Sequence, residues 1–256
     1  MAASETILRI EGVSKVFGSS ERAVTALHNV SLEARPGEVV LVMGPSGSGK
    51  TTLLTIAGAL LRPTRGTVYL SNTNVTQMDE RRLASIRREK VGFVYQSFNL
   101  LEALTALENV RLVMLDRIAN GRLPRDQARE LLEVLGLGHR LNSLPRHLSD
   151  GEKQRVAIAR ALAKNPDLIL ADEPTANLDT KRGHEVMELL RQKALETEKA
   201  VVIASHDHRI RDIADRVLWL EDGHLRPESP EPLPSATPRP EKRQQPPTAP
   251  RAGQPL

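Results

Sequence analysis

The stretch Gly44-Pro45-Ser46-Gly47-Ser48-Gly49-Lys50-Thr51 matches the pattern GxxxxGK[ST] at every fixed position. The apolar run Val39–Met43 precedes it, and the helix-forming residues Leu53, Leu54 and Ile56 follow it. Glycines let such a loop turn so tightly that its amide N–H groups converge on an anion, and the following helix adds the positive end of its dipole. We therefore expect a phosphate-binding loop, or P-loop, between a buried strand and a helix.

The residue types in this loop indicate which of its residues would bind a nucleoside triphosphate and Mg²⁺. Lys50 is expected to reach the β- and γ-phosphates, and the hydroxyl of Thr51 to ligate Mg²⁺, with Thr52 beside it. The residues predicted to bind ATP here are Gly44, Pro45, Ser46, Gly47, Ser48, Gly49, Lys50, Thr51 and Thr52.

A P-loop needs a carboxylate that helps to hold the metal, at the end of a neighbouring buried strand. The apolar run Leu168–Ala171 leads into Asp172 and Glu173. We expect Asp172 to bind Mg²⁺ directly or through water, and Glu173 to polarise the attacking water as general base. The alternative role for Asp172 is that of a helix N-cap before Pro174. The interval between the P-loop and Asp172 is long enough to hold an inserted subdomain.

Short apolar runs without polar alternation predict strands that are buried on both faces. They are Val39–Met43, Leu168–Ala171, Ala200–Ala204 and Val217–Leu220. Such runs indicate an α/β fold with a mostly parallel sheet covered by helices. The spacing of apolar residues from Ala128 to Leu135 predicts a helix that ends at Gly136, and Asp222-Gly223 predicts a hairpin turn.

Composition excludes several classes of protein. Of 256 residues, 36 are Lys or Arg and 32 are Asp or Glu, and this small excess does not predict nucleic-acid binding. The locally basic segment from Arg81 to Lys90 is expected to form a solvated helix face, with a phosphate or lipid contact as the alternative. There is no cysteine, no apolar stretch of bilayer length and no secretion signal, so we expect a cytoplasmic protein.

The last part of the chain differs from the rest in composition. Residues 227–256 contain ten of the 17 prolines and few apolar side chains. We expect a nucleotide-binding domain over residues 1–226 and a disordered, proline-rich tail over 227–256. A docking peptide for a partner is the alternative for the tail.

Further segments occur in an order that resembles the nucleotide-binding subunits of ABC transporters, from about Ile7 to Leu225. The matching segments are Val94–Leu101 around Gln96 (the Q-loop), Leu148–Glu152 with the helix Lys153–Leu162 (the signature), Asn177–Asp179 (the D-loop), Ser205–Asp207 (the H-switch) and Phe17 before Gly18.

The resemblance implies a P-loop NTPase fold of ABC type. It has a RecA-like core with a mostly parallel sheet, an antiparallel β subdomain and an inserted α-helical subdomain, here at about residues 97–163. Gln96 would meet the metal and the nucleophilic water, His206 would position that water, and Phe17 would stack on adenine. Ser149 and Gly151 would meet the γ-phosphate bound by the opposite subunit.

The details of these motifs resemble the lipoprotein-release and macrolide-export subfamily. The resemblance implies an ATPase that forms a homodimer or heterodimer and powers a separate membrane permease, on whose cytoplasmic side it sits. Export, or extraction of lipoproteins or lipids, is the expected task. Cell-division members of the subfamily supply the alternative, an ATPase that signals across the membrane without transport. A soluble ABC protein acting on DNA or ribosomes is a third class, and the single nucleotide domain counts against it.

The signature departs from the family pattern LSGGQ at two positions, Asp150 and Glu152. Glu152 forms a capping box with Ser149, which is a structural reason for its presence. Asp150 suits the helix dipole but places a negative charge where a polyanion docks. A carboxylate that points to solvent would matter little, whereas one that faces the phosphate would weaken dimer closure. We hypothesise that ATP turnover is retained but damped by Asp150.

Overall fold

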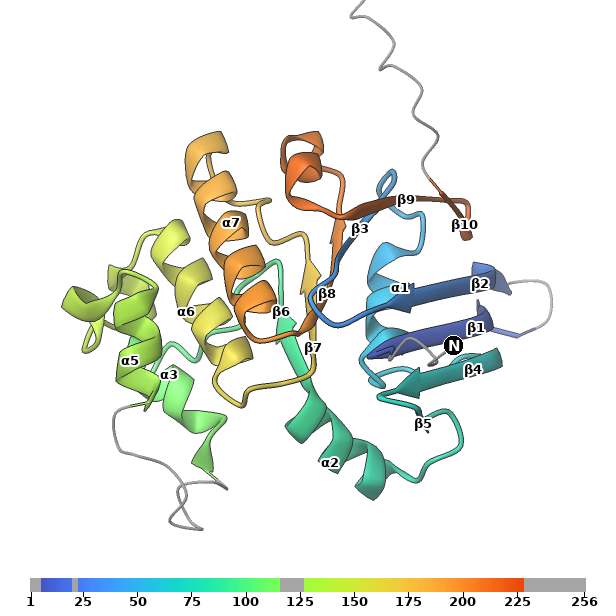
Figure 1. Cartoon of the computed structure of the whole chain (residues 1–256), viewed down its shortest axis with the longest axis horizontal. Helices are drawn as coiled ribbons and strands as arrows, with labels where there is room; N and C mark the ends of the chain where they lie inside the picture. Colours follow the sequence, from blue (N-terminus) through green and yellow to red (C-terminus); the bar gives the residue numbers. More distant parts are fainter. Residues whose placement is uncertain (1–5, 20–22, 116–126, 228–256) are drawn as a thin grey trace, which may run out of the picture.

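The computed structural model describes residues 6–19, 23–115 and 127–227, and these form two sheets with helices around them (Figure 1). The antiparallel sheet has the strand order β2 (Val24–Ala34), β1 (Leu8–Phe17), β4 (Arg65–Leu70) and β5 (Thr73–Asn74). The second sheet has the order β10 (His224–Pro227), β9 (Arg216–Glu221), β3 (Val39–Met43), β8 (Ala200–Ser205), β7 (Leu168–Asp172) and β6 (Val91–Val94). All of its pairings are parallel except that of β9 with β10.

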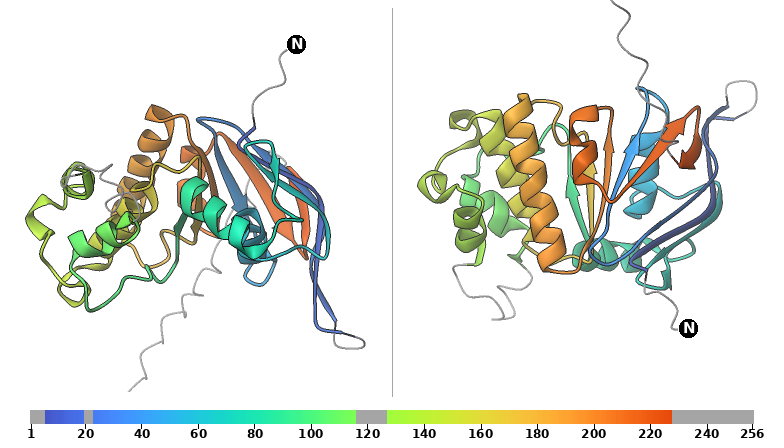
Figure 2. Two further views of the ribbon diagram at one scale, coloured as in Figure 1. Left: turned by 90° about the horizontal axis from the view of Figure 1, so that it is seen from below. Right: turned by 45° about the horizontal axis from the view of Figure 1, so that its top comes forward.

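Helices cover the second sheet and separate it from a helical region (Figure 2). The α-helices are α1 (Lys50–Ala57), α2 (Glu80–Lys90), α3 (Ala106–Leu112), α5 (Gln127–Val134), α6 (Asp150–Leu162) and α7 (Thr180–Glu196). Short 3₁₀ helices are η2 (Gly138–Arg140), η3 (Pro145–His147) and η4 (His208–Ile213). Helices α6 and α7 pack side by side against the second sheet, α3 and α5 pack on α6, and α1 lies between the two sheets.

Alternate residues of the central strand β3 enter two separate cores, because successive side chains of a strand point to opposite faces. Val39, Leu41 and Met43 pack with α6 and α7, while Val40 and Val42 pack with α1 and the antiparallel sheet. Every residue of β3, β7 and β8 is buried. The expectation of a mostly parallel sheet covered on both faces is confirmed.

The predicted elements appear with small shifts at their ends. The strands β7 and β8 each run one residue further than their apolar runs, to Asp172 and Ser205. Ladder hydrogen bonds continue past the last apolar side chain, and this brings both polar residues onto the sheet edge. Asp222 and Gly223 have positive φ angles and join β9 to β10, as the hairpin prediction requires.

Two predictions concern the ends of the domain and the basic helix. In α2, Leu83 is buried and Ile86 packs on the core, Arg81, Arg82 and Arg88 are exposed, and Arg87 is half-buried and donates to the carbonyl of Ala59 at 2.9 Å. The tail from residue 228 lies outside the described residues, and the domain boundaries stay a prediction. Within the part of the chain that is described, no helix is long and apolar enough to cross a membrane.

The topology brings the sequence motifs to one edge of the sheet. Strands β3, β6, β7 and β8 run parallel, so their carboxyl ends meet. The P-loop follows β3, Gln96 follows β6, Glu173 follows β7 and His206 follows β8.

Candidate active site

The P-loop wraps the start of α1 and depends on glycine at two positions. Gly44 has φ +152°, and a Cβ there would lie 1.9 Å from the carbonyl oxygen of Leu220. Gly49 has φ +106°, and a Cβ there would lie 2.5 Å from the oxygen of Ala26. Gly49 is also the N-cap of α1 and provides no side-chain hydrogen bond, which leaves the first amides of the helix for an anion.

Lys50 is buried and its ammonium group lies inside the loop. Nζ donates to the carbonyl oxygens of Gly44 and Pro45, each at 2.9 Å, and lies 3.9 Å from Oε1 of Glu173. The hydroxyl of Ser48, within the loop, is buried and has no hydrogen-bond partner in the described part of the chain. A buried cation and an unsatisfied hydroxyl beside open amides form a cradle for phosphate oxygens.

The residues predicted to hold Mg²⁺ are in contact with each other. The hydroxyl of Thr51 donates to Oδ1 of Asp172 at 3.2 Å. Burial raises the pKa of the Asp172 carboxyl, and the hydrogen bond from Thr51 opposes that rise. A hydroxyl and a carboxylate at the mouth of a phosphate cradle are ligands that suit Mg²⁺, which takes few protein ligands and shares the rest with phosphates and water. The alternative of Asp172 as an N-cap is wrong, because Asp172 ends strand β7 and the next helix, α7, begins at Thr180 with Asp179 as its N-cap.

Glu173 is fixed by the end of the neighbouring strand. Its backbone has φ +46°, and its amide donates to the carbonyl of Ala204 at 2.8 Å. Oε2 accepts hydrogen bonds from the hydroxyl of Ser205 at 3.0 Å and the amide of His206 at 3.3 Å, and Oε1 lies 2.9 Å from Nδ1 of His206. A positive φ in a non-glycine residue is stored strain that surrounding contacts must hold, and it aims this carboxylate at the P-loop.

A cavity of about 310 Å³ joins these groups. The predicted site residues that line it are Ser46, Gly47, Gly49, Lys50, Thr51, Thr52, Gln96, Glu173 and His206. The structure thus brings the P-loop, the Q-loop and the H-switch together around one space.

Seven predicted site residues do not line this cavity: Gly44, Pro45 and Ser48 of the P-loop, Asp172 beside it, and Phe17, Ser149 and Gly151 further away. Phe17 is 43% exposed near the end of β1, with the ammonium of Lys15 at 5.1 Å from its ring centroid. Ser149 and Gly151 are at the start of α6, and neither lines the cavity. This placement fits a role for the signature at another copy's nucleotide.

The signature forms the predicted capping box. The Ser149 hydroxyl accepts from the Glu152 amide at 3.3 Å, and the Ser149 amide donates to Oε2 of Glu152 at 2.7 Å. Arg140 donates to Oε1 of Glu152 at 2.9 Å. Burial raises the pKa of Glu152, but the hydrogen bonds from Ser149 and Arg140 outweigh it and hold the pKa below its usual range. The Asp150 carboxylate is 54% exposed and accepts from Lys153 Nζ at 3.0 Å.

Sequence reasoning missed three supporting residues. Ser205 holds Glu173, and Asn177 donates to the carbonyl of Gln96 at 3.0 Å. Asp207 accepts from Thr175 at 3.0 Å and from two nitrogens of Arg209 at 2.7 Å each. The paired hydrogen bonds from Arg209 lower the pKa of Asp207 to about 2. All three lie inside the D-loop and H-switch segments, and that position is the signal in the sequence that could have indicated them.

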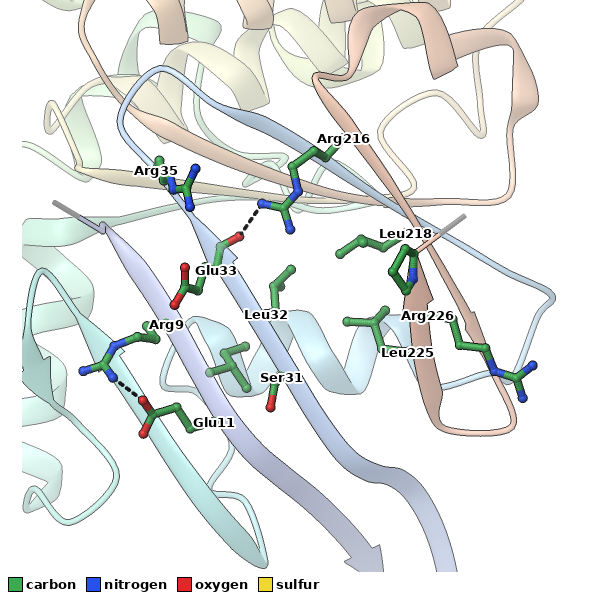
Figure 3. A pocket seen from close by; sticks show the side chains of 12 residues that line it. Arg9, Glu11, Ser31, Leu32, Glu33, Arg35, Arg216, Leu218, Leu225 and Arg226 are labelled. Carbon is green, nitrogen blue, oxygen red and sulfur yellow. Dashed lines mark hydrogen bonds and ion pairs between the residues drawn. The ribbon is translucent and has the colours of Figure 1, made fainter. Parts of the chain in front are cut away.

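A second cavity of about 480 Å³ lies between the edge strands β2 and β10 (Figure 3). Leu32, Leu218 and Leu225 lie along it, with arginines around them. Two of these arginines are paired: Arg9 with Glu11, and Arg216 with Glu38 at 2.7 Å. No predicted site residue lines this cavity, so it is separate from the nucleotide site.

Comparison with known proteins decides the family. The model of the family described as ABC transporter matches residues 27–176, more than half of the chain. The chain belongs to the ABC transporter family. It is an ATP-binding subunit of that family, an ATPase whose relatives act with membrane permeases, and the expected fold, family and activity are confirmed.

Relatives match this ABC subunit over most of its length. An uncharacterized ABC transporter ATP-binding protein of Thermotoga maritima is 48% identical over 219 residues, 86% of this chain and 93% of that protein. The lipoprotein-releasing system ATP-binding protein LolD 2 of Caulobacter vibrioides is 46% identical over 222 residues, 87% and 97% of the two chains.

A solved relative shows the same fold with nucleotide. The ATP-binding cassette MJ0796 of Methanocaldococcus jannaschii, in a dimeric post-hydrolysis state bound to ADP and Pi, superimposes with a TM-score of 0.78 at 42% identity. The match covers 86% of this chain and 98% of that chain.

Proposed function

We propose that two copies of this chain close on two ATP molecules, each bound between the P-loop of one copy and the signature of the other. The observation that carries this is the division of the site. The cavity holds Lys50, Glu173 and His206, but Ser149 lies outside it, so a single copy leaves one side of the γ-phosphate uncovered. The dimeric state of the cassette MJ0796 supports the same arrangement.

Thr51 and Asp172 would hold Mg²⁺, with Gln96 reaching it from the Q-loop. When bound, the ion supplies positive charge that neutralises the phosphate oxygens. The raised pKa of Asp172 fits this role, because a buried carboxylate without a cation is unfavourable as an anion.

Hydrolysis follows from the positions of the other residues. A water attacks the γ-phosphorus in line with the bond to the β-phosphate, the new P–O bond forms and the old one breaks, and ADP leaves. Glu173 accepts the proton of that water. Ser205 and His206 hold the two carboxylate oxygens of Glu173 in place. Lys50 turns from the carbonyls of Gly44 and Pro45 to the β- and γ-phosphates. Phe17 stacks on adenine from β1, and Ser149 with the amide of Gly151 completes the other copy's site.

The names of the relatives in lipoprotein-releasing systems support a role of the complex in moving lipoproteins or lipids. We propose that ATP-driven closing and opening drives a permease that extracts or exports lipoproteins or lipids, and that the subunit is bound to the cytoplasmic face of the membrane through that permease.

Substitution of Glu173 by Gln tests the catalytic assignment. The amide keeps the shape but cannot take a proton, so the variant should bind ATP, form a stable dimer seen by sedimentation, and release phosphate at least about a hundredfold more slowly. Glu188→Gln, at an exposed position of α7, is the matched control and should behave like the parent. Full hydrolysis by Glu173→Gln, or by Lys50→Ala, contradicts the proposal.

Isolation of the complex tests the task. The tagged chain should retain a membrane permease on purification, and vesicles containing that complex should release an inserted lipoprotein only with hydrolysable ATP. A complex that hydrolyses ATP but binds no lipoprotein or lipid contradicts the transport proposal and leaves the ATPase assignment intact.

A further inference from the structure

The Q-loop contains two residues in the left-handed backbone region. Phe98 has φ +60° and Asn99 has φ +49°. Asparagine tolerates this region, whereas a bulky phenylalanine adopts it at a cost that neighbouring contacts must offset. Both follow closely after Gln96, so whatever holds them also sets the direction in which Gln96 enters the active site.

Asn177 and hydrogen bonds within the loop hold part of this segment, and the signature helix holds Phe98 and Asn99 themselves. Arg160, in the last turn of α6, donates to the carbonyl of Phe98 from Nη2 at 2.7 Å and to the carbonyl of Asn99 from Nη1. A planar guanidinium that binds two successive carbonyls fixes both peptide groups at once. The backbone of the Q-loop is thus attached to a helix whose first residues are the signature.

A second cation on the same face of α6 contacts the side chain of the loop. Lys153 lies seven residues before Arg160, two turns away on the same face of the helix. Its Nζ lies 5.8 Å from the ring centroid of Phe98, within the range of a cation–π contact. The same Nζ lies 3.0 Å from Oδ1 of Asp150.

These contacts form a continuous series from one motif to the other. Asp150 directly follows Ser149, the N-cap of α6. Asp150 holds Lys153, Lys153 covers Phe98, and Phe98 is two residues from Gln96. The acidic residue that departs from the family pattern therefore has a partner in this chain and does not stand as an isolated charge.

We propose that Lys153 and Arg160 are positioning residues that join the Q-loop to the signature loop. Arg160 fixes the loop backbone, and Lys153 relays the position of Asp150 to the ring of Phe98. This inference rests on the proposed function, in which Ser149 binds the other copy's nucleotide. Because Gln96 lines the cavity of its own copy, engagement of Ser149 at one site is transmitted to Gln96 at the other.

Hydrogen exchange of the Q-loop amides measures this connection. The experiment uses the Glu173→Gln chain, with and without ATP and magnesium, and follows residues 97–101 by mass spectrometry. In the Glu173→Gln chain without a further substitution, which serves as the parent, closure of the dimer should slow exchange of residues 97–101. Lys153→Met should still form the ATP dimer, but the slowing should shrink about two- to fivefold, the factor that corresponds to an exposed cation–π contact. Lys153→Arg, which retains the cation, should restore it.

A matched control and a second variant distinguish an effect on the position of the Q-loop from a general effect of lost surface charge or of disturbed folding. Lys181, exposed on α7, makes no hydrogen bond or ion pair within the described residues, and Lys181→Met should leave the slowing unchanged. Arg160→Lys should speed exchange of the loop even without ATP. Three results would overturn the inference, provided that the dimer still forms. They are full slowing of exchange in Lys153→Met, an equal loss of slowing in Lys181→Met, and failure of Lys153→Arg to restore the slowing. A parent that does not close on ATP overturns the proposed function as well.

Discussion

The Nδ1 atom of His206 lies 2.9 Å from Oε1 of Glu173, although 32 residues separate the two in the chain. They follow the neighbouring parallel strands β8 and β7, whose carboxyl ends meet at the sheet edge. The pair is supported by Ser205, which holds the second oxygen of the carboxylate.

Replacement of Ser205 by Ala should slow ATP hydrolysis about tenfold to a hundredfold without weakening ATP binding. The hydroxyl donates to a carboxylate, and loss of a hydrogen bond to a charged group costs about 1.5–3 kcal/mol. Steady-state kinetics should show a lower kcat at a similar KM. Ser85→Ala, in α2 and away from the cavity, is the control. A kcat equal to that of the parent would rule out this role for Ser205.

Replacement of Asp172 by Asn should raise the magnesium concentration needed for half-maximal nucleotide binding by about tenfold or more, because one anionic ligand is lost. Burial raises the pKa of Asp172 above its ordinary value of 3.8. Protons therefore compete with the ion at higher pH than at an ordinary aspartate, and the parent's magnesium affinity should fall as pH falls toward this raised pKa. Titrations at several pH values check this, and an Asn variant with the same pH profile would contradict it.

Replacement of Asp207 by Asn should lower the free energy of unfolding at pH 7 by about 1 kcal/mol, after allowance for solvent screening. The pKa of Asp207 lies at about 2 in the folded chain, below its ordinary value of 3.8, because Arg209 binds it. The stabilisation is therefore complete above pH 3.8 and is lost as the pH falls toward about 2. Denaturant titrations of parent and variant should differ at pH 7 and converge near pH 2; a constant difference would contradict the assignment.

Replacement of Asp150 by Gly should change steady-state ATP hydrolysis by no more than about twofold. The carboxylate is exposed and paired with Lys153, and a surface pair three residues apart on a helix is worth about 0.3–0.5 kcal/mol. This orientation does not support strong damping by Asp150. A variant that hydrolyses ATP ten times faster would show instead that the carboxylate repels the phosphate on closure.

Replacement of Gly44 by Ala should destabilise the fold by more than about 2 kcal/mol and abolish ATP binding. The added Cβ would lie 1.9 Å from the carbonyl oxygen of Leu220, in backbone that cannot yield without moving the sheet. Gly47→Ala is the matched control. It also has a positive φ but meets nothing within 4 Å, so we expect a loss of about 1 kcal/mol. Equal losses in the two variants, measured by thermal unfolding, would exclude the steric explanation.

The sequence alone predicted the features that depend on local pattern. The P-loop needs glycine where the chain turns and lysine where phosphate binds, and both are visible at fixed spacing. Fully buried strands appear as apolar runs, and the Asp222-Gly223 turn and the capping box of Ser149 with Glu152 involve residues within a few positions of each other. The family resemblance indicated Gln96 and His206 as site residues, since neither residue would have been informative when taken alone.

Only the tertiary structure decided which distant side chains meet. Ser205 reaches Glu173, Asn177 reaches the carbonyl of Gln96, and Arg160 reaches Phe98 across 62 residues. These contacts depend on parallel strands ending at one edge and on α6 packing beside the Q-loop, and side-chain spacing in the chain encodes neither. The orientation of Asp150 was also decided only by the structure. A carboxylate at the start of a helix can point to solvent or to a ligand, and here it pairs with Lys153 and is exposed.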